Sequence, residues 1–330
     1  MTPGKVVHLL RDTRLGGVTR MIHTLVDGGA LADIDQSLHA VDDPRGWCAA
    51  SRGAGTIVLH DSLSWRLLPW LFLLRLRRPR ARIILVEHSY CAGFEHHCVP
   101  VRGRFRSMLA LSYALVDKVV AVSAAQQRWM LDARLLPARK LQVIYPHLDY
   151  SRLLRLEPPA CTRRLRIGAI GRLHEQKGFD RLIHAVSALG RRDVEVLIAG
   201  DGPQIDRLKA LAHGLPQVRF YGRTDDIARF MQQVDLVVVP SRYEPFGIVA
   251  AEARAAGRPI LVAANDGLAE QVTPGTGWVI ENDTVQALVE ALDAIPARRE
   301  LRAAGALARE SLTGEYEVSM HRWRRLLTAP

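Results

Sequence analysis

The chain alternates short apolar runs with longer segments of helical length. In the first half, the predicted strands are Val6–Leu10, Thr56–Leu59, Ile83–Val86 and Val119–Val122. The second half repeats the rhythm at Arg166–Ile170, Val194–Ala199, Val218–Tyr221, Leu236–Val239, Ile260–Val262 and Gly277–Ile280. Apolar, β-branched runs that alternate with helical segments are typical of parallel α/β sheets. The pattern therefore predicts two α/β units in tandem.

A stretch without clear periodicity separates the two halves. Residues 155–162 include the adjacent prolines Pro158 and Pro159, which favour a linker. We expect an N-terminal acceptor domain over residues 1–157 and a C-terminal donor domain over residues 158–312. Residues 313–330 should form a final helix, since Tyr316, Met320, Trp323 and Leu327 recur near one helical face. That helix could pack on either domain, including the N-terminal one by crossing back.

Composition is that of an ordinary globular protein. The 330 residues are 48% hydrophobic and 24% charged, which suits two domains with substantial cores. The four cysteines have no spacing typical of a disulfide framework and favour a reducing compartment. No apolar signal-peptide core develops near the N-terminus, so we predict a cytoplasmic location.

The positive charge is concentrated in the first half. Residues 1–160 carry 22 Lys and Arg against 13 Asp and Glu, whereas residues 161–330 carry 23 against 21. Such an asymmetry indicates an anionic partner, either nucleic acid or an acidic membrane surface. The basic half lacks aromatic residues interleaved at the spacing of a nucleic-acid module, so we do not expect nucleic acid to bind.

The segment from Trp65 to Arg82 combines apolar bulk with six arginines. It is too short to span a bilayer, which needs about 20 apolar residues. One interpretation is a buried helix with an arginine-rich, solvated end. The other is an interfacial helix that docks on the inner face of the cell membrane, where arginines meet anionic headgroups.

The most informative stretch covers residues 241–253. It follows the predicted strand Leu236–Val239 and leads into an alanine-rich helix. Glu244 is expected in the connecting loop and Glu252 inside the helix, with seven residues between them. Gly247 would let a ligand approach the backbone, where the unpaired amides of a helix start favour phosphate.

With Pro245-Phe246-Gly247 between the two glutamates, this stretch resembles the E-x7-E motif of retaining glycosyltransferases of family GT4, also called glycosyltransferase group 1. Other phrases follow in the family's order: Gly171-Arg172-Leu173, Lys177-Gly178-Phe179-Asp180, Ala199-Gly200-Asp201-Gly202-Pro203, Val218–Gly222 and Gly257-Arg258-Pro259-Ile260. The first half offers the weaker matches Gly16–Arg20, Glu87-His88-Ser89 and Val122-Ser123. The resemblance implies an α/β GT-B fold, in which two Rossmann-like domains face each other across a cleft.

The resemblance also implies roles for residues of the second half. Arg172 and Lys177 would bind the donor diphosphate, whose negative charge rises as the glycosidic bond breaks. Glu252 would accept hydrogen bonds from the ribose hydroxyls. Glu244 would approach the transferred sugar, helped by the backbone amides of Phe246, Gly247 and Ile248.

Three further positions complete the expected site. His88 would lie at the cleft, near the donor sugar and the acceptor. Gly16 and Gly17 would form a glycine loop beside the donor, although they could equally make a turn. Arg223 follows a strand whose end faces the nucleotide base in the family, but a solvated arginine is nearly as good an interpretation.

No metal or cofactor is expected. GT-B enzymes typically act without a metal, and the group His88, Cys91, His96, His97 and Cys98 lacks the paired spacing of a structural zinc site. No G-x-G-x-x-G follows the first strand, which disfavours NAD, and there is no Walker A motif. Residues 266–270 contain one glycine where the family often has a pair, so this chain departs from the family pattern at the expected sugar pocket.

Together these features predict a retaining, metal-independent, hexosyltransferase-type enzyme. It would move a sugar from a UDP- or GDP-sugar to an acceptor hydroxyl, with a lipid-linked or glycan acceptor, in bacterial cell-surface polysaccharide or glycolipid assembly. Two alternatives stay open: a nucleotide-sugar epimerase of the same fold, and a non-catalytic protein that binds sugar nucleotides or membranes.

Overall fold

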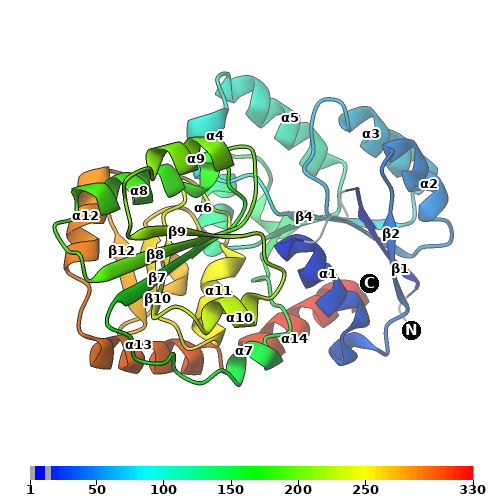
Figure 1. Ribbon diagram of the computed structural model, residues 1–330. Coiled ribbons are helices and arrows are strands. Elements are labelled where there is room, and N and C mark those ends of the chain that lie inside the picture. Colours follow the sequence, from blue (N-terminus) through cyan, green and yellow to red (C-terminus); the bar gives the residue numbers. More distant parts are fainter. Residues whose placement is uncertain (1–3, 12–15, 330) are drawn as a thin grey trace. The chain divides into compact units, whose positions relative to one another are not determined.

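The computed structural model describes residues 4–11 and 16–329. They divide into two compact units, one made of the chain up to Leu148 together with the segment from Gly314, and the other of Asp149–Thr313. Each unit contains one six-stranded parallel sheet with helices on both faces (Figure 1). The position at which we expected the domain boundary, Glu157, lies inside the second unit.

The sheet of unit 1 has the strand order β2-β1-β3-β4-β5-β6. Its strands are β1 (Val6–Leu10), β2 (Gln36–Ala40), β3 (Thr56–Leu59), β4 (Arg82–Glu87), β5 (Lys118–Ala121) and β6 (Leu141–Val143). Its helices are α1 (Gly17–Asp27), η1 (Gly29–Leu31), η2 (Pro44–Gly46), α2 (Trp47–Ala50), α3 (Leu68–Arg77), α4 (Ala92–Cys98), α5 (Arg102–Ala114), α6 (Ala124–Asp132), η3 (Ala138–Lys140) and α14 (Glu315–Thr328).

The sheet of unit 2 has the order β12-β11-β10-β7-β8-β9. Its strands are β7 (Leu165–Ile170), β8 (Val194–Ala199), β9 (Val218–Gly222), β10 (Leu236–Val239), β11 (Ile260–Ala263) and β12 (Gly277–Ile280). Its helices are α7 (Ser151–Leu154), η4 (Glu175–Lys177), α8 (Phe179–Ala188), α9 (Ile205–Leu211), α10 (Ile227–Met231), α11 (Ile248–Ala255), η5 (Ala269–Gln271), α12 (Val285–Asp293) and α13 (Arg298–Glu310).

The central strands agree with the hydrophobic pattern because both of their faces are covered. In β3, β10 and β11 every residue is buried, as expected for strands that carry helices on both sides. The two strands that the sequence did not predict, β2 and β6, lie at the edges of the first sheet. β2 is half-buried and reads Gln-Ser-Leu-His-Ala, and β6 has three residues, so neither carries an apolar run.

The arginine-rich segment forms α3, which buries one side. Leu71 and Leu74 are buried in the core of unit 1, while Phe72 and Leu76 are 58% and 65% exposed. Arg75 donates to the carbonyl of Leu115 at 3.0 Å. The segment is therefore a core helix with an exposed apolar and basic outer side. No helix in the described part of the chain is long and apolar enough to span a membrane.

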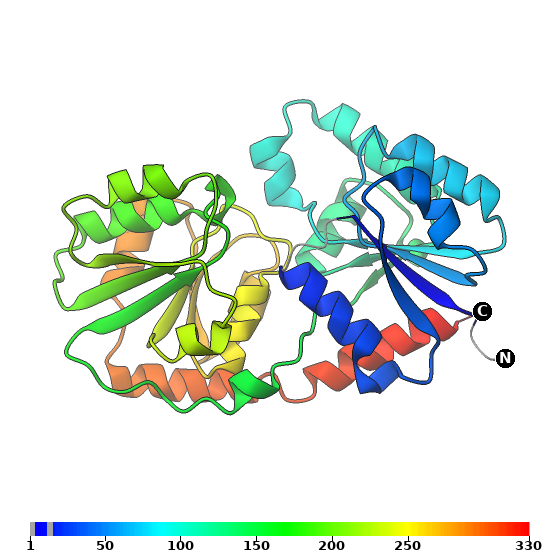
Figure 2. The ribbon, with the colours of Figure 1, turned by 45° about the vertical axis from the view of Figure 1, so that its right-hand side comes forward.

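The last helix, α14, belongs to unit 1 (Figure 2). Met320, Trp323 and Leu327 are buried, as their helical spacing predicts. Arg324 contacts both carboxylate oxygens of Asp33 in a bidentate ion pair, and Arg82 of β4 donates to the carbonyl oxygens of Leu326 and Ala329. The helix is thus tied to the sheet of unit 1 at several points.

Candidate functional site

In unit 1, the carboxyl end of β4 presents His88, which is half-buried. Its Nε2 lies 3.1 Å from Nδ1 of His60, which follows β3 directly. Nε2 of His60 in turn lies 3.0 Å from Nδ1 of His8 in β1. His60 and His88 follow neighbouring strands whose carboxyl ends meet at one edge of the sheet, and His8 lies inside the adjacent strand β1. Only His88 was expected at a site from the sequence.

The environment of these histidines disfavours charge. Burial lowers the pKa of His8 and of His88 to about 4, and it lowers the pKa of His60 well below the ordinary value. The neighbouring carboxyl group of Glu87 is also buried, and burial raises its pKa to about 7. Its oxygens accept from the amides of Ser89 and Tyr90 at 3.0 and 3.1 Å and from the Tyr113 hydroxyl at 3.1 Å.

The predicted glycine loop is only partly described. Gly16 is an extended, exposed residue directly before α1, and Gly17 is the first residue of that helix. Residues 12–15, which precede them, lie outside the described residues. The role expected for Gly16 and Gly17 therefore stays a prediction.

In unit 2, the loops after β7 and β10 bring two predicted site residues into contact. Nζ of Lys177, in η4, lies 2.5 Å from Oε2 of Glu244, in the loop before α11. The two side chains are 19% and 12% exposed. They form a close, largely buried ion pair at the carboxyl edge of the sheet, where ligands of open α/β sheets usually bind.

Backbone and side-chain contacts fasten these two loops together. The amide of Arg242 donates to the carbonyl of Gln176 at 2.7 Å, and the guanidinium of Arg242 donates to both carboxylate oxygens of Asp180 at 2.9 and 2.7 Å. Gly178 has a φ of +67° and lies against the carbonyl oxygen of Pro240, which a Cβ would strike. Only glycine fits this conformation and approach without strain, so Gly178 lets Lys177 reach Glu244.

A third loop supports Glu244. The amide of Glu244 donates to Oδ2 of Asp266 at 3.2 Å, and the amide of Gly267 donates to the Glu244 carbonyl at 3.1 Å. The Ser241 hydroxyl lies 3.2 Å from Oε2 of Glu244. The segment with a single glycine therefore holds the backbone of Glu244. The contacts by which Ser241 and Asp266 support Glu244 were not predicted from the sequence.

Helix α11 begins at Ile248, after Gly247 in the left-handed conformation with a φ of +90°. Within the described part of the chain, no side chain caps this helix start by a hydrogen bond. The buried Gln271 amide donates to the carbonyls of Phe246 and Gly247 at 2.6 and 2.9 Å, which fixes the entry into the helix. Uncapped amides at a helix start favour an anionic ligand.

The remaining predicted residues of unit 2 differ in exposure. Glu252 lies in α11, as expected, and is 1% exposed. Arg172 is exposed and follows β7, the strand that leads to Lys177. The side chain of Arg223 is 67% exposed and lies 3.9 Å from Asp225, so its solvated interpretation stays open.

Residues 158–306 match a protein-family model described as "Glycosyl transferases group 1". The match contains Lys177, Glu244 and Glu252. This region of the second unit, named the group 1 domain, is similar to group 1 glycosyltransferases.

Two relatives are similar to this chain over about half of its length. A D-inositol 3-phosphate glycosyltransferase of Geodermatophilus obscurus is 31% identical over 58% of this chain and 48% of its own length. A GDP-mannose-dependent phosphatidylinositol monomannoside mannosyltransferase of Corynebacterium glutamicum is 33% identical over 49% of this chain and 46% of its own length. The chain thus spans less than half the length of these relatives.

The likeness to solved structures extends outside the group 1 domain. The crystal structure of Anabaena HepE in complex with UDP and glucose is similar with a TM-score of 0.78 at 17% identity, over 99% of this chain and 100% of that one. At this identity the match establishes the fold alone. The expectation of two Rossmann-like α/β domains of the GT-B type is confirmed.

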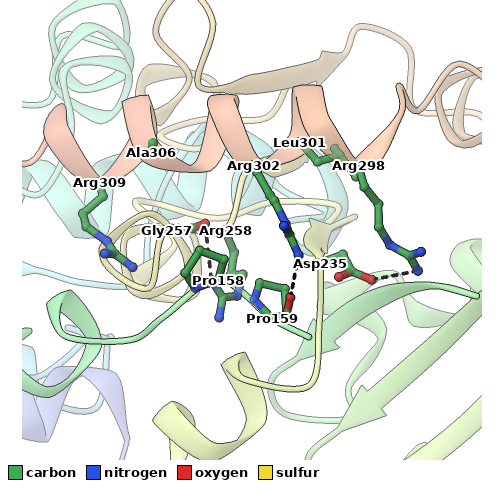
Figure 3. A pocket seen from close by; sticks show the side chains of 10 residues that line it. All are labelled: Pro158, Pro159, Asp235, Gly257, Arg258, Arg298, Leu301, Arg302, Ala306 and Arg309. Carbon is green, nitrogen blue, oxygen red and sulfur yellow. Dashed lines mark hydrogen bonds and ion pairs between the residues drawn. The ribbon is translucent and has the colours of Figure 1, made fainter. Parts of the chain in front are cut away.

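An arginine-lined pocket of the group 1 domain lies at the opposite edge of the sheet, where Asp235 precedes β10 (Figure 3). Its arginines bind carbonyls of the segment before β7. Arg258 donates to Glu157 at 2.9 Å, and Arg302 donates to Pro159 at 3.0 Å. The guanidinium groups are committed to main-chain oxygens, so we assign this pocket a structural role in holding residues 156–164.

The cysteine and histidine group of unit 1 does not converge. Cys91 is buried, whereas His96, His97 and Cys98 are exposed along α4. Within residues 4–11 and 16–329, no three His, Cys, Asp or Glu side chains are arranged to hold a metal ion. Metal independence of the protein stays a prediction.

Proposed function

We propose that this chain is a glycosyltransferase that moves a sugar from a UDP- or GDP-sugar to an acceptor hydroxyl. The contact between Lys177 and Glu244 beside the uncapped start of α11, inside a group 1 domain, is the observation that carries the proposal. It provides a cation for phosphate and a carboxylate for sugar hydroxyls within one small area. Relatives that are named as GDP-mannose-dependent, and a fold neighbour bound to UDP, support a nucleotide-sugar donor.

The ion pair suggests how the donor engages. Oε2 of Glu244 lies 2.5 Å from Nζ of Lys177 and neutralises its charge. A diphosphate would compete for Lys177 and leave the Glu244 carboxylate to accept hydrogen bonds from the transferred sugar. Lys177, Arg172 and the start of α11 would then stabilise the charge that develops on the leaving diphosphate. We propose a retaining reaction that needs no metal ion, with same-face attack by the acceptor.

We further propose a lipid-linked or membrane-proximal glycan acceptor, as in bacterial surface polysaccharide or glycolipid assembly. The outer side of α3 exposes Phe72 and Leu76 next to Arg77, and Arg104 lies over the ring of the exposed Trp65 at 5.9 Å. Such a combination suits an anionic membrane surface. Sedimentation with phosphatidylglycerol vesicles at low salt should pellet the protein, and Arg77→Gln with Phe72→Ser should reduce the pelleted fraction. Equal binding to neutral vesicles would contradict this part.

Thermal denaturation with a panel of UDP, GDP and their sugars tests the donor site. A bound nucleotide raises the melting temperature in step with saturation and affinity. We expect one base to stand out, with and without EDTA. No shift with any nucleotide would contradict the proposal, and a shift abolished by EDTA would contradict metal independence.

Product analysis separates the alternatives. An epimerase would interconvert the donor sugar without an acceptor, whereas a glycosyltransferase would join the sugar to an added acceptor. Binding without either product would favour a non-catalytic role. Glu310→Gln, at an exposed position of α13, is the matched control for substitutions of the buried glutamates.

A further inference from the structure

Three histidine rings of unit 1 lie edge to edge, with nearly parallel planes, in a continuous hydrogen-bonded row across neighbouring strands. The ring centroids of His8 and His60 are 5.3 Å apart with an interplanar angle of 18°, and those of His60 and His88 are 5.4 Å apart with an angle of 21°. Each contact joins Nδ1 of one ring to Nε2 of the next, at 3.0 and 3.1 Å. Along the row from His88 to His8, each ring therefore turns its Nε2 toward the next member of the row.

Gln36 of β2 lies at the end of the row that is formed by His8. Its Oε1 lies 3.1 Å from Nε2 of His8. Its amide nitrogen lies 3.5 Å from the carbonyl oxygens of both Leu25 and Leu31, which can only accept. Turning the amide over would place Oε1 against those two carbonyls. Hence Oε1 must face His8, and His8 must donate from Nε2.

The donor direction of every hydrogen bond between the three histidines follows from this one donor. A neutral imidazole carries one N–H, so His8 that donates from Nε2 accepts at Nδ1. His60 then donates from Nε2 and accepts at Nδ1, and His88 donates from Nε2. We propose that Gln36, His8 and His60 are positioning residues that hold His88 in the Nε2–H tautomer, with its Nδ1 kept unprotonated as an acceptor.

Other arrangements place like groups against each other. If all three rings carried the proton on Nδ1, no donor would face Oε1 of Gln36. An imidazolium at His60 would direct a second N–H at His88, which donates along the same line. A buried donor or acceptor without a partner carries the full cost of its desolvation. The burial that lowers the pKa of His8 and His88 to about 4 also favours neutral rings.

The consequence for chemistry rests on the proposed function. A transferase that discriminates among hydroxyl groups needs an acceptor whose protonation does not fluctuate. Nδ1 of a locked, neutral His88 would accept a hydrogen bond from a substrate hydroxyl at the carboxyl edge of unit 1. The second nitrogen of a functional histidine commonly sets its tautomer in this manner.

Nitrogen NMR of the full chain tests the lock. With ¹⁵N-labelled histidine, two-bond ¹H–¹⁵N spectra at pH 7.5 distinguish the two tautomers and the imidazolium. We expect His8, His60 and His88 each as a single Nε2–H tautomer, assigned by substituting each in turn. Gln36→Met removes the terminal acceptor at similar length, so the single set should become a mixture that includes Nδ1–H forms at His8 and His88.

Ser37→Ala, the next residue of β2, is the matched control and should leave the three patterns unchanged. An Nδ1–H or doubly protonated His88 in the unmodified chain would overturn the inference, even if Gln36→Met did not fold. A folded Gln36→Met with unaltered tautomers would also overturn it. The spectra need no nucleotide, so the expected tautomers in a protein without transferase activity would support the lock while contradicting the proposed function.

Discussion

The carboxyl edges of the two sheets carry opposite solutions to the same geometric problem. In unit 1, three imidazoles and Gln36 satisfy one another in a desolvated chain with no formal charge. In unit 2, Lys177 and Glu244 face each other at 2.5 Å as full charges. In each sheet polar groups follow the carboxyl ends of strands, and in unit 1 they connect back to His8 inside β1 and to Gln36 at the start of β2. Under the proposed function, unit 1 would present a neutral hydrogen-bonding group, and unit 2 would exchange one ionic partner for another.

Acidification gives the largest expected effect and acts on the neutral edge. The folded histidines have lowered pKa values, so below about pH 6.5 the unfolded chain binds more protons. Stability should therefore fall with falling pH, by about 1.4 kcal/mol per pH unit for each histidine, down to about pH 4. His60→Phe should reduce the proton uptake on unfolding by about one.

Urea denaturation between pH 7.5 and 5 measures this slope. Tryptophan fluorescence reports mainly on unit 1, which holds five of the six tryptophans. His213→Asn, at an exposed position of unit 2, serves as the control. The same slope in His60→Phe and the unmodified chain would show that His60 is not held neutral in the folded protein.

Glu87 should act with the opposite sign. Its pKa is about 7 in the folded chain against an ordinary 4.5, so between these values the folded state binds the extra proton. This group therefore lowers stability as pH rises from 4.5 to 7, by about 3 kcal/mol in total. Glu87→Gln removes this titrating group. The stability of the variant relative to the unmodified chain should therefore improve as pH rises from 4.5 to 7. A constant difference from pH 5 to 8 would show that Glu87 is ionised throughout.

Nucleotide affinity tests the charged edge. Lys177→Ala and Arg172→Ala should each weaken binding of the preferred nucleoside diphosphate by roughly 1–3 kcal/mol, the range for charge-assisted hydrogen bonds. Isothermal titration calorimetry measures the change, with Lys209→Ala on the exposed surface of α9 as the control. Affinity unaltered in both variants would refute the diphosphate site.

Substitution of Glu244 and of Glu252 should change different kinetic constants, and these are the smallest effects that we predict. Glu252→Gln should raise KM and weaken free nucleotide binding by about 1 kcal/mol, because ribose would be bound equally in the ground state and in the transition state. Glu244→Gln should lower kcat by about tenfold and spare nucleotide affinity, since its partner changes as the sugar bond breaks. Equal losses of nucleotide affinity would contradict the division of roles.

Much of this could be predicted from the sequence, for identifiable reasons. Buried central strands such as β3 and β10 carry continuous apolar runs, which a sequence shows directly. Glu244 lies in the loop before α11 and Glu252 lies inside that helix, as their spacing in the sequence predicts. The edge strands β2 and β6 lack such runs because they are covered less completely. His8 and His60 escaped notice for a different reason. Their association depends on strand order, which a single sequence does not contain, although His60 and His88 both follow predicted strands.

The return of α14 to unit 1 has a consequence for how the chain is made. Unit 1 contains both the first strand and the last helix, with residues 149–313 between them. On the ribosome, the complete unit 2 emerges before Met320 and Trp323 can cover the first sheet. Domains generally fold as units during synthesis, so unit 2 should reach its native state first. Until Arg324 can pair with Asp33, unit 1 therefore lacks the helix that completes it, although its sheet is synthesised first.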